Sequence, residues 1–325
     1  MTVGIGVIGA GGMAQTRFDI LATDERAVVR GIYDVDTTRA EQAAARFGAR
    51  PYADLDALLD DPSLDAIFVC VPPDAHGSPE IHAAKRGIDV FVEKPIALRT
   101  RDAMDILATI EESGVIAQVG HNWRYSTGFE RAREILDKRP IGYLDGRWWG
   151  GVPGGPNYWW RERSRSGGQA IEQGIHVYDA MRYLAGDVER VWAAGGNRLV
   201  DIVDFPDVSS ATMEHRSGII SHVTTSCAAQ ASTRGVEVIA AGATISISQG
   251  RLSGTVDGET IDMTFDTDPY QREVDAFLSA VSSGDRGRCR SPYRDAVRSL
   301  AVTEAATRSM DIGEPIFVDD LLKPD

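Results

Sequence analysis

The stretch VGIGVIGAGGMA, residues 3–14, determines the fold of this chain. A short apolar run leads into glycines that fit the pattern G-x-G-x-x-G/A, with Ala14 in the last position, and a helical pattern follows at once. Small residues permit a tight turn and a close approach of the backbone to a phosphate, and the helix N-terminus offers N–H donors. A turn that serves packing alone has the same composition. The position between strand and helix predicts instead a dinucleotide-binding loop formed by Gly9, Gly11, Gly12 and Met13.

Asp34 ends the second strand pattern, GIYD, twenty residues beyond Ala14. A carboxylate at this spacing can accept hydrogen bonds from the adenosine ribose hydroxyls, which favours NAD over NADP. Arg39 lies close enough in the sequence to bind a 2′-phosphate, so NADP stays possible. We therefore expect NAD as the cofactor, with Asp34 and Arg39 deciding between the two nucleotides.

Two kinds of sequence pattern divide the chain near residue 120. Residues 3–120 alternate short Val- and Ile-rich runs with helical stretches, which predicts a doubly wound parallel sheet. From about residue 189 to 267 several strand-like runs follow one another without helices, which predicts a mostly antiparallel sheet. We expect a loop at 148–166 and one helix over 168–185. The interpretation is an α/β chain with a dinucleotide-binding domain at 1–120 and a domain for substrate binding and oligomerisation at 121–325.

Composition excludes several classes of partner. The 325 residues carry 34 basic and 48 acidic side chains, a formal net charge of −14. Such a chain is repelled by nucleic acids and by anionic membrane surfaces. The three cysteines form neither a CxxC pair nor an even framework, so we expect no disulfides and no structural zinc. The N-terminus does not resemble a signal peptide and no apolar run is long enough to span a membrane. A soluble, cytoplasmic protein is expected.

Only four of the 34 basic residues are lysines. One of them, Lys94, follows the strand pattern Val90-Phe91-Val92 in the sequence Glu93-Lys94-Pro95, and ligands bind at the carboxyl ends of parallel strands. A lysine ammonium is a compact charge that can hydrogen-bond a substrate hydroxyl and stabilise an alkoxide. A surface ion pair between Glu93 and Lys94 is the alternative, and spacing alone does not decide between the two.

Glu172 and His176 lie four residues apart on the helical pattern 168–185 and are expected to share one face. A neutral imidazole can take a hydroxyl proton near neutral pH, and a neighbouring carboxylate can orient the ring. A glutamate that suits the helix dipole beside an incidental histidine is the alternative. A metal site would need further ligands, and no H-E-x-x-H motif occurs, so we expect no metal.

Aromatic residues and arginines gather in and before the expected loop. Trp160 with Arg161, and Trp123 with Arg124 in GHNWRY, are candidates for substrate binding. Indole faces can stack on the C–H face of a sugar ring, and arginines can hold anionic groups. A hydrophobic plug between the domains, with solvated arginines beside it, is the alternative for most of this stretch.

Taken together, these segments resemble the Gfo/Idh/MocA oxidoreductase family over nearly the whole length. The segments that carry the resemblance are VGIGVIGAGGMA with Asp34, VCVPPDAHGSPEIHAAKRGIDVFVEKPIAL, GHNWRY and GGQAIEQGIHVYDAMRYLAG. The family implies a Rossmann domain followed by an α/β domain with a large open sheet, which commonly mediates dimers or tetramers. We therefore expect a homodimer or homotetramer.

The resemblance also implies roles for single residues. Lys94 matches the family lysine at the reacting centre, His176 matches the catalytic histidine, and Glu172 stands where many members have aspartate. Pro95 matches a proline that is often preceded by a cis peptide bond. His76 matches a histidine near the cofactor, although a simple loop position is equally compatible with the sequence. Further cofactor contacts are expected from Pro72, Glu93 and Lys94.

The predicted activity is that of an NAD(P)-dependent dehydrogenase acting on a secondary alcohol or ketone of a sugar, an inositol or a related polyol. A dinucleotide-binding regulator without catalysis and a glycosidase that uses NAD transiently are the alternatives. The particular sugar or polyol and the physiological direction do not follow from the residues.

Overall fold

The computed structural model describes residues 2–323, and the chain divides into two compact units. The first unit comprises the chain through Ala97, Asp102–Gly120 and Tyr270–Asp295. The second comprises Leu98–Arg101, His121–Pro269 and the chain from Ala296. Both units are therefore discontinuous in sequence, whereas the predicted domains were two continuous segments that meet at residue 120.

The first unit is built on a parallel sheet of six strands within the described residues, in the order β3-β2-β1-β4-β5-β6. The strands are β1 (Val3–Ile8), β2 (Ala27–Tyr33), β3 (Arg50–Tyr52), β4 (Ala66–Val69), β5 (Asp89–Val92) and β6 (Ala117–Val119). All residues of β1 and β4 are buried, as expected for parallel strands covered on both faces. This topology confirms the predicted doubly wound sheet.

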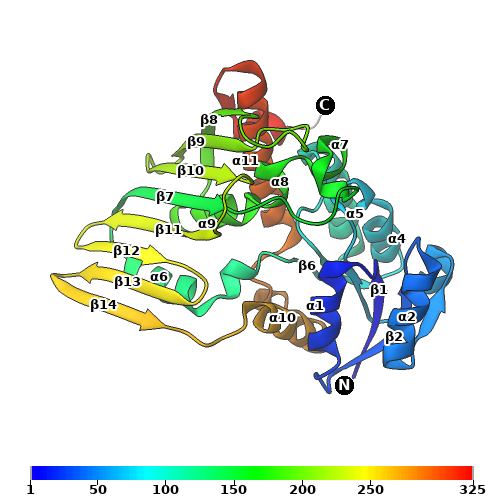
Figure 1. Ribbon diagram of the computed structural model, residues 1–325. Coiled ribbons are helices and arrows are strands. Elements are labelled where there is room, and N and C mark those ends of the chain that lie inside the picture. Colours follow the sequence, from blue (N-terminus) through cyan, green and yellow to red (C-terminus); the bar gives the residue numbers. More distant parts are fainter. Residues whose placement is uncertain (1, 324–325) are drawn as a thin grey trace. The chain divides into compact units, whose positions relative to one another are not determined.

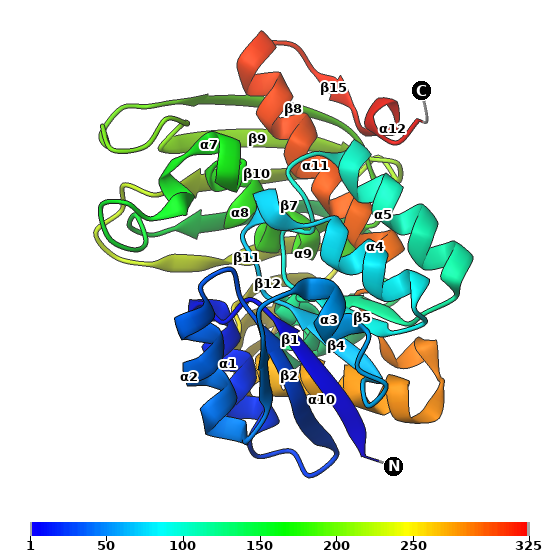
Figure 2. The same cartoon turned by 90° about the vertical axis from the view of Figure 1, so that its right-hand side faces the viewer.

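Helices lie on both faces of this sheet. They are α1 (Gly12–Leu21), α2 (Thr37–Phe47), α3 (Leu55–Leu59), α4 (Ser78–Lys85), α5 (Thr100–Ser113) and α10 (Pro269–Ser283), with a short 3-10 turn η1 (Pro73–Ala75). Figure 2 shows α1 and α2 on one side of β1 and β2 and α3 on the other. Helix α2 begins at an Asp36 cap that accepts the N–H groups of Thr38 and Arg39, and it ends at Gly48 in the left-handed conformation.

The second unit contains a sheet of nine strands among the described residues, in the order β14-β13-β12-β11-β7-β10-β9-β8-β15. The strands are β7 (Ile141–Trp149), β8 (Val188–Gly196), β9 (Val208–His215), β10 (Ile220–Ser226), β11 (Thr233–Ala240), β12 (Ala243–Ile247), β13 (Arg251–Val256), β14 (Glu259–Thr264) and β15 (Ile316–Phe317). Figure 1 shows β14 to β8 side by side in this order. Only β7 and β10 pair in parallel, which confirms the predicted mostly antiparallel sheet.

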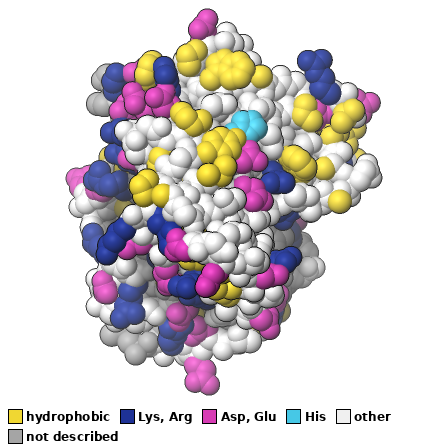
Figure 3. Space-filling view, turned by 90° about the vertical axis from the view of Figure 1, so that its left-hand side faces the viewer, with side chains coloured by type: hydrophobic (Ala, Val, Ile, Leu, Met, Phe, Trp, Pro, Cys, Tyr) yellow, Lys and Arg dark blue, Asp and Glu magenta, His cyan; other side chains and the backbone are white. Residues whose placement is uncertain are grey.

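One face of the nine-stranded sheet is covered and the other is open. Helices α6 (Thr127–Leu136), α9 (Ile175–Ala185) and α11 (Tyr293–Ile312) pack on the covered face through a shared apolar core. The shorter elements are η2 (Asn122–Tyr125), η3 (Trp159–Arg161), α7 (Arg163–Ser166), α8 (Gln169–Glu172), η4 (Arg286–Arg288) and α12 (Val318–Leu321). Along β7 and β10 buried residues alternate with partly exposed ones, so the second face is left to solvent. Figure 3 shows this face, with hydrophobic, charged and histidine side chains mixed on it.

Two local predictions were wrong. The single helix expected over 168–185 is two helices, α8 and α9, interrupted at Gln173 and Gly174. The helical spacing that placed Glu172 and His176 on one face therefore does not apply, since each belongs to its own helix. The loop expected from residue 148 begins later, because Trp148 and Trp149 end strand β7. Between residues 2 and 323, the structure has no helix that is both long and apolar enough to cross a membrane.

Candidate active site

The glycine loop leaves open space at the beginning of α1. Gly9 has a φ of +87°, and a Cβ there would lie 2.4 Å from the carbonyl oxygen of Cys70. A Cβ at Gly11 or Gly12, in contrast, would meet nothing within 4 Å. Gly11 caps α1 without a side-chain hydrogen bond, and no acidic residue stands in the first turn. The N–H groups at this helix end can therefore receive an anionic group such as a pyrophosphate.

Asp34 joins the glycine loop to the end of β2. Its buried carboxylate accepts the N–H of Ala10 at 2.7 Å and the N–H of Asp36 at 2.8 Å. The half-exposed guanidinium of Arg39 lies 3.2 Å from Asp34 Oδ1. The structure thus brings Asp34 and Arg39 together, next to the loop.

His76 lies in the segment that follows β4 and η1, after Pro72 and Pro73. Its Nδ1 is 2.5 Å from Glu80 Oε1, and the other oxygen of Glu80 accepts the N–H of Gly77 at 2.7 Å. Both side chains are buried. Within residues 2–323, His76 Nε2 has no hydrogen-bond partner although it is buried. Because a buried polar atom of this kind is costly to leave unsatisfied, His76 is suited to bind a ligand through Nε2.

Glu93 takes part in a buried ion cluster at the end of β5. Arg17, on α1, donates from Nε to Glu93 Oε1 at 2.7 Å and from Nη2 to Glu273 Oε1 at 2.6 Å. Burial opposes the charge of Arg17, but the charges of Glu273 and Glu93 outweigh this effect, so the pKa of Arg17 is raised. Lys94 is partly buried, and the peptide bond between Lys94 and Pro95 is cis, as the family resemblance implied.

In the second unit Glu172 is held by an aromatic side chain of the neighbouring loop. Trp160 Nε1 donates to Glu172 Oε2 at 2.5 Å. The Trp160 ring is fully buried and meets Phe205 edge-on, with ring centroids 5.0 Å apart. Burial and the charge of Glu172 raise the pKa of Tyr158, which places this carboxylate near the same loop. Trp160 is thus both packed against an aromatic ring and hydrogen-bonded to the Glu172 carboxylate, within the second unit.

His176 lies in the first turn of α9 among aromatic rings. Its imidazole is nearly parallel to the indole of Trp148, with centroids 4.9 Å apart and an interplanar angle of 15°. Trp123 is a second aromatic neighbour of His176, and the two ring centroids are 6.1 Å apart. From the sequence, Trp123 is a candidate substrate residue, and Trp148 was considered only as part of the aromatic stretch, for sugar stacking or for hydrophobic packing. The signal for Trp148 was the alternation along β7, which puts it on the covered face of the sheet.

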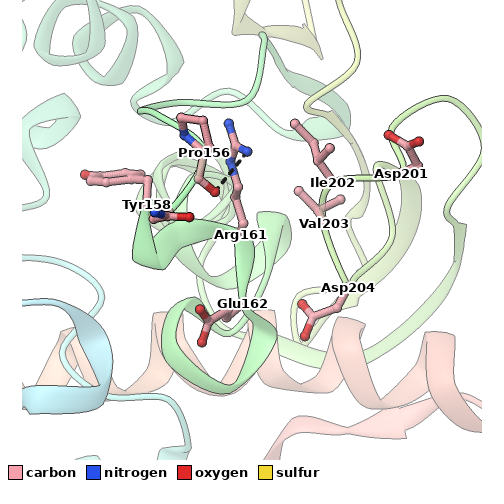
Figure 4. Close-up of a pocket in the computed structure, with 9 residues that line it drawn as sticks. Pro156, Tyr158, Arg161, Glu162, Asp201, Ile202, Val203 and Asp204 are labelled. Carbon is pink, nitrogen blue, oxygen red and sulfur yellow. Dashed lines mark hydrogen bonds between the residues drawn. The ribbon is translucent and has the colours of Figure 1, made fainter.

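The two candidate arginines have different surroundings. Arg124 is buried and binds Asp179 with two hydrogen bonds, from Nε at 2.8 Å and from Nη2 at 2.6 Å. Arg161 is partly exposed and lines a pocket of about 600 Å³, where its Nη1 donates to the carbonyl oxygen of Pro156 at 3.2 Å. Figure 4 shows Arg161 and Tyr158 on one side of this pocket and Asp201 to Asp204 on the other. Arg161 is therefore the more accessible of the two.

No group of three or more His, Cys, Asp and Glu side chains in residues 2–323 is placed to hold a metal ion. Lys94 belongs to the first unit, whereas Glu172 and His176 belong to the second. Arg17 and Trp148 were not predicted as site residues. The available signal for Arg17 was a lone arginine among the apolar residues on the buried face of α1.

A parallel sheet with an open glycine loop and an acidic residue after the second strand is typical of a dinucleotide-binding Rossmann domain. Residues 3–121 match the family model described as "Oxidoreductase family, NAD-binding Rossmann fold", and residues 129–246 match the "GFO/IDH/MocA C-terminal domain". The chain belongs to the Gfo/Idh/MocA family. This membership confirms the predicted family, the NAD-binding domain and the class of an NAD(P)-dependent oxidoreductase.

The chain is similar to proteins with two different stated activities, a dehydrogenase and a hydratase. The chain is 30% identical over 308 residues to the scyllo-inositol 2-dehydrogenase (NAD(+)) of Bacillus subtilis (strain 168), with 86% of each chain covered. It is 30% identical over 201 residues to the 2,7-anhydro-N-acetylneuraminate hydratase of Mediterraneibacter gnavus, a match that covers 60% of this chain and 53% of that protein. An oxidoreductase from Agrobacterium radiobacter, whose crystal structure contains NAD+, L-tartaric acid and magnesium, has the same fold. Its TM-score is 0.90 at 21% identity, over 99% of this chain and 100% of that one.

Proposed function

We propose that the protein is a dehydrogenase that transfers a hydride between NAD and a secondary alcohol of a sugar, an inositol or a related polyol. The observation that carries this proposal is the open loop at Gly11 and Gly12 beside the buried carboxylate of Asp34. The inositol dehydrogenase that shares 30% of its residues over 86% of each chain supports the substrate class.

The first unit holds the cofactor in this proposal. The N–H groups that follow Gly11 receive the pyrophosphate, and Asp34 accepts the ribose hydroxyls. We propose further contacts from Gly9, Met13, Pro72, His76, Glu93 and Lys94. Bound NAD supplies the nicotinamide ring that accepts the hydride. Arg39 is tied to Asp34, which favours NAD and leaves a cation in place for NADP.

Three residues carry the chemistry. His176 accepts the proton of the substrate hydroxyl as the C–H bond releases its hydride and the carbonyl forms. Lys94 donates a hydrogen bond to the same oxygen and stabilises the negative charge that develops on it. Glu172 supports the protonated imidazole electrostatically, and its own position is fixed by Trp160. Trp123, Trp160, Arg124 and Arg161 are proposed to shape the substrate side, with Arg161 the most accessible of the four.

The experiment that tests this function follows the absorbance of reduced nicotinamide while purified protein, NAD and a panel of sugars and inositols are mixed. We expect turnover with at least one polyol. Lys94→Ala and His176→Ala should each lower kcat by about 100-fold or more while NAD binding is kept. Lys138→Ala, which removes a lysine that is 90% exposed, is the matched control. Unchanged turnover in Lys94→Ala or in His176→Ala refutes the role of that residue.

A second candidate is a reaction in which NAD is used only transiently, with hydrolysis or hydration of a sugar as the net result. This candidate is supported by the similarity to the hydratase of Mediterraneibacter gnavus, which is 30% identical to this chain over 201 residues. Conversion of an anhydro-sugar or glycoside without accumulation of NADH identifies this activity. Tight NAD binding with no conversion of any panel compound indicates the non-catalytic regulator.

We also propose that the protein is cytoplasmic and assembles as a homodimer or homotetramer through the open face of the nine-stranded sheet. Partly exposed apolar side chains, Tyr143, Ile220 and Ile239, lie on this face next to the Asp145–His222 pair. Figure 3 shows apolar and charged side chains on this face. Ile220 and Ile239 are exposed large hydrophobics, and apolar side chains exposed together on one face are typical of association surfaces. Light scattering of wild type and of Ile239→Glu tests the assembly, since a charge in a self-complementary contact should yield smaller species.

A further inference from the structure

The imidazole of His176 packs against indole rings from two other elements. Trp148, on β7, lies almost parallel to it, and the two side chains are 7% and 6% exposed. Trp123, on η2, adds a second ring that is inclined by 24° to the imidazole and by 31° to Trp148. The ring centroids of Trp123 and Trp148 are themselves 5.8 Å apart, so the three planar groups from α9, β7 and η2 form a compact triangular cluster in the core of the second unit.

Trp148 is itself fixed by contacts on its edge and on its ring. Its Nε1 donates to Gln173 Oε1 at 3.1 Å, next to the break between α8 and α9. The guanidinium carbon of Arg234 lies 4.2 Å from the ring centroid, within the range of a cation–π interaction. Both contacts hold the indole in one orientation, so the plane that it offers to His176 is defined.

The close approach of α9 to β7 depends on a glycine. Gly146 lies two residues before Trp148 on the same face of β7, and a Cβ there would come within 2.4 Å of Val177 Cγ1. Val177 is the residue after His176. The missing side chain at Gly146 thus lets the first turn of α9 reach the strand, where the imidazole meets the indole.

A histidine that accepts a proton must present one nitrogen at hydrogen-bond distance and in line with the hydroxyl. Rotation about the last torsion of histidine is broad in energy, so that torsion is set by the surroundings. A hydrogen bond at one nitrogen still allows the ring to tilt, whereas a near-parallel indole fixes the plane and hence the directions of both nitrogens. Small displacements of a reacting group can lower a rate by about 100-fold.

We propose that Trp148 is a positioning residue that sets the plane of His176 for proton transfer, with Trp123 packed against both rings. Trp148 acts through His176 and does not contact the substrate. This inference rests on the proposed role of His176 and assigns a task to a residue that would otherwise be only part of the core.

The test compares Trp148→Leu with the conservative Trp148→Phe. We expect Trp148→Leu to lower kcat by at least tenfold while the KM for the polyol changes less than threefold, because positioning affects the step and not the affinity. Trp148→Phe keeps an aromatic face and should recover most of the lost kcat. Leu144→Ala is the matched control, since Leu144 is fully buried on the same face of β7 and its truncation destabilises the same core while all three rings are kept.

A nuclear magnetic resonance measurement separates this inference from the proposed function. The imidazole C–H signals of His176, assigned with His176→Asn, should move downfield in Trp148→Leu because the ring current of the indole is lost. Wild-type kcat in Trp148→Leu, or an equal loss of kcat in Leu144→Ala, overturns the positioning role. If wild type oxidises no polyol, the proposed function fails and the positioning role falls with it, while the signal shift still reports whether the stack exists.

Discussion

The guanidinium of Arg17 donates a 2.7 Å hydrogen bond to Glu93, and neither side chain is appreciably exposed. Arg17 stands in the helix that follows the glycine loop, and Glu93 immediately precedes Lys94. A second carboxylate, Glu273, binds the same guanidinium from α10. The guanidinium carbon of Arg17 also lies 4.7 Å from the centroid of the Phe91 ring, within the range of a cation–π interaction. A buried ion pair thereby joins helix α1 to the end of strand β5, directly before Lys94.

Removal of this charge should strongly destabilise the protein. Arg17→Met leaves Glu93 and Glu273 buried without their common partner, a situation that costs about 3–5 kcal/mol. Urea unfolding of wild type and variant measures the difference. Arg46→Met, which breaks an exposed pair with Asp19, serves as the control and should cost about 1 kcal/mol or less. Equal stability of the two variants would contradict a structural role of the cluster.

Substitution of two glycines of the loop by alanine should have different effects: Gly9→Ala should lower stability, and Gly12→Ala should weaken NAD binding. Gly9→Ala places a Cβ against the Cys70 carbonyl in a backbone conformation with positive φ, so the free energy of unfolding should fall by more than about 1 kcal/mol. Gly12→Ala has open space and a helical position, so stability should be kept, but the methyl group occupies the space meant for the pyrophosphate. We expect at least tenfold weaker NAD binding. Thermal unfolding and calorimetric titration with NAD measure both effects, and wild-type affinity in Gly12→Ala refutes the assignment of the loop.

The nucleotide preference should change when Asp34 loses its charge. Asp34→Asn keeps an acceptor for the N–H of Ala10 but no longer repels a 2′-phosphate, and Arg39 is released to bind one. We expect the ratio of kcat/KM for NADP to that for NAD to rise by about tenfold or more, equivalent to ~1.4 kcal/mol. The double variant Asp34→Asn/Arg39→Ala should lose most of this gain. No change in the ratio would mean that Asp34 does not face the ribose.

Asp179 should contribute to stability in a pH-dependent manner. Burial favours its neutral form, but Arg124 and His121 outweigh burial and hold the pKa of Asp179 well below the ordinary value. A carboxyl group with a lowered pKa stabilises the folded state above its unfolded pKa, and this contribution is lost as the pH falls below about 4. The difference in unfolding free energy between wild type and Asp179→Asn should therefore shrink as the pH falls below about 4. Urea unfolding at a series of pH values measures it, and a difference that stays constant down to pH 2 contradicts the prediction.

The nucleotide loop and the two kinds of sheet could be predicted from the sequence because their signals are local. A glycine pattern between a strand and a helix, and the presence or absence of helices between strands, are visible within short windows. The helix over 168–185 was mispredicted for the same reason. Its periodicity continues across Gln173 and Gly174, while the break depends on tertiary packing. A Cβ at Gly174 would lie 3.0 Å from Thr225 Cγ2, on β10, a contact that no local pattern contains.

By itself the sequence determined the fold class, the glycine pattern between β1 and α1, and the place of Asp34 directly after β2. These features follow from backbone preferences and from residue types at fixed spacing. Which side chains contact the site residues and fix their positions depends on the tertiary structure. Arg17 meets Glu93 and Glu273 across 76 and 256 residues of chain, and Trp148 reaches His176 because Gly146 lets α9 approach β7. Contacts of this kind depend on how whole elements pack, and that packing is set by the complete core and not by any segment of it.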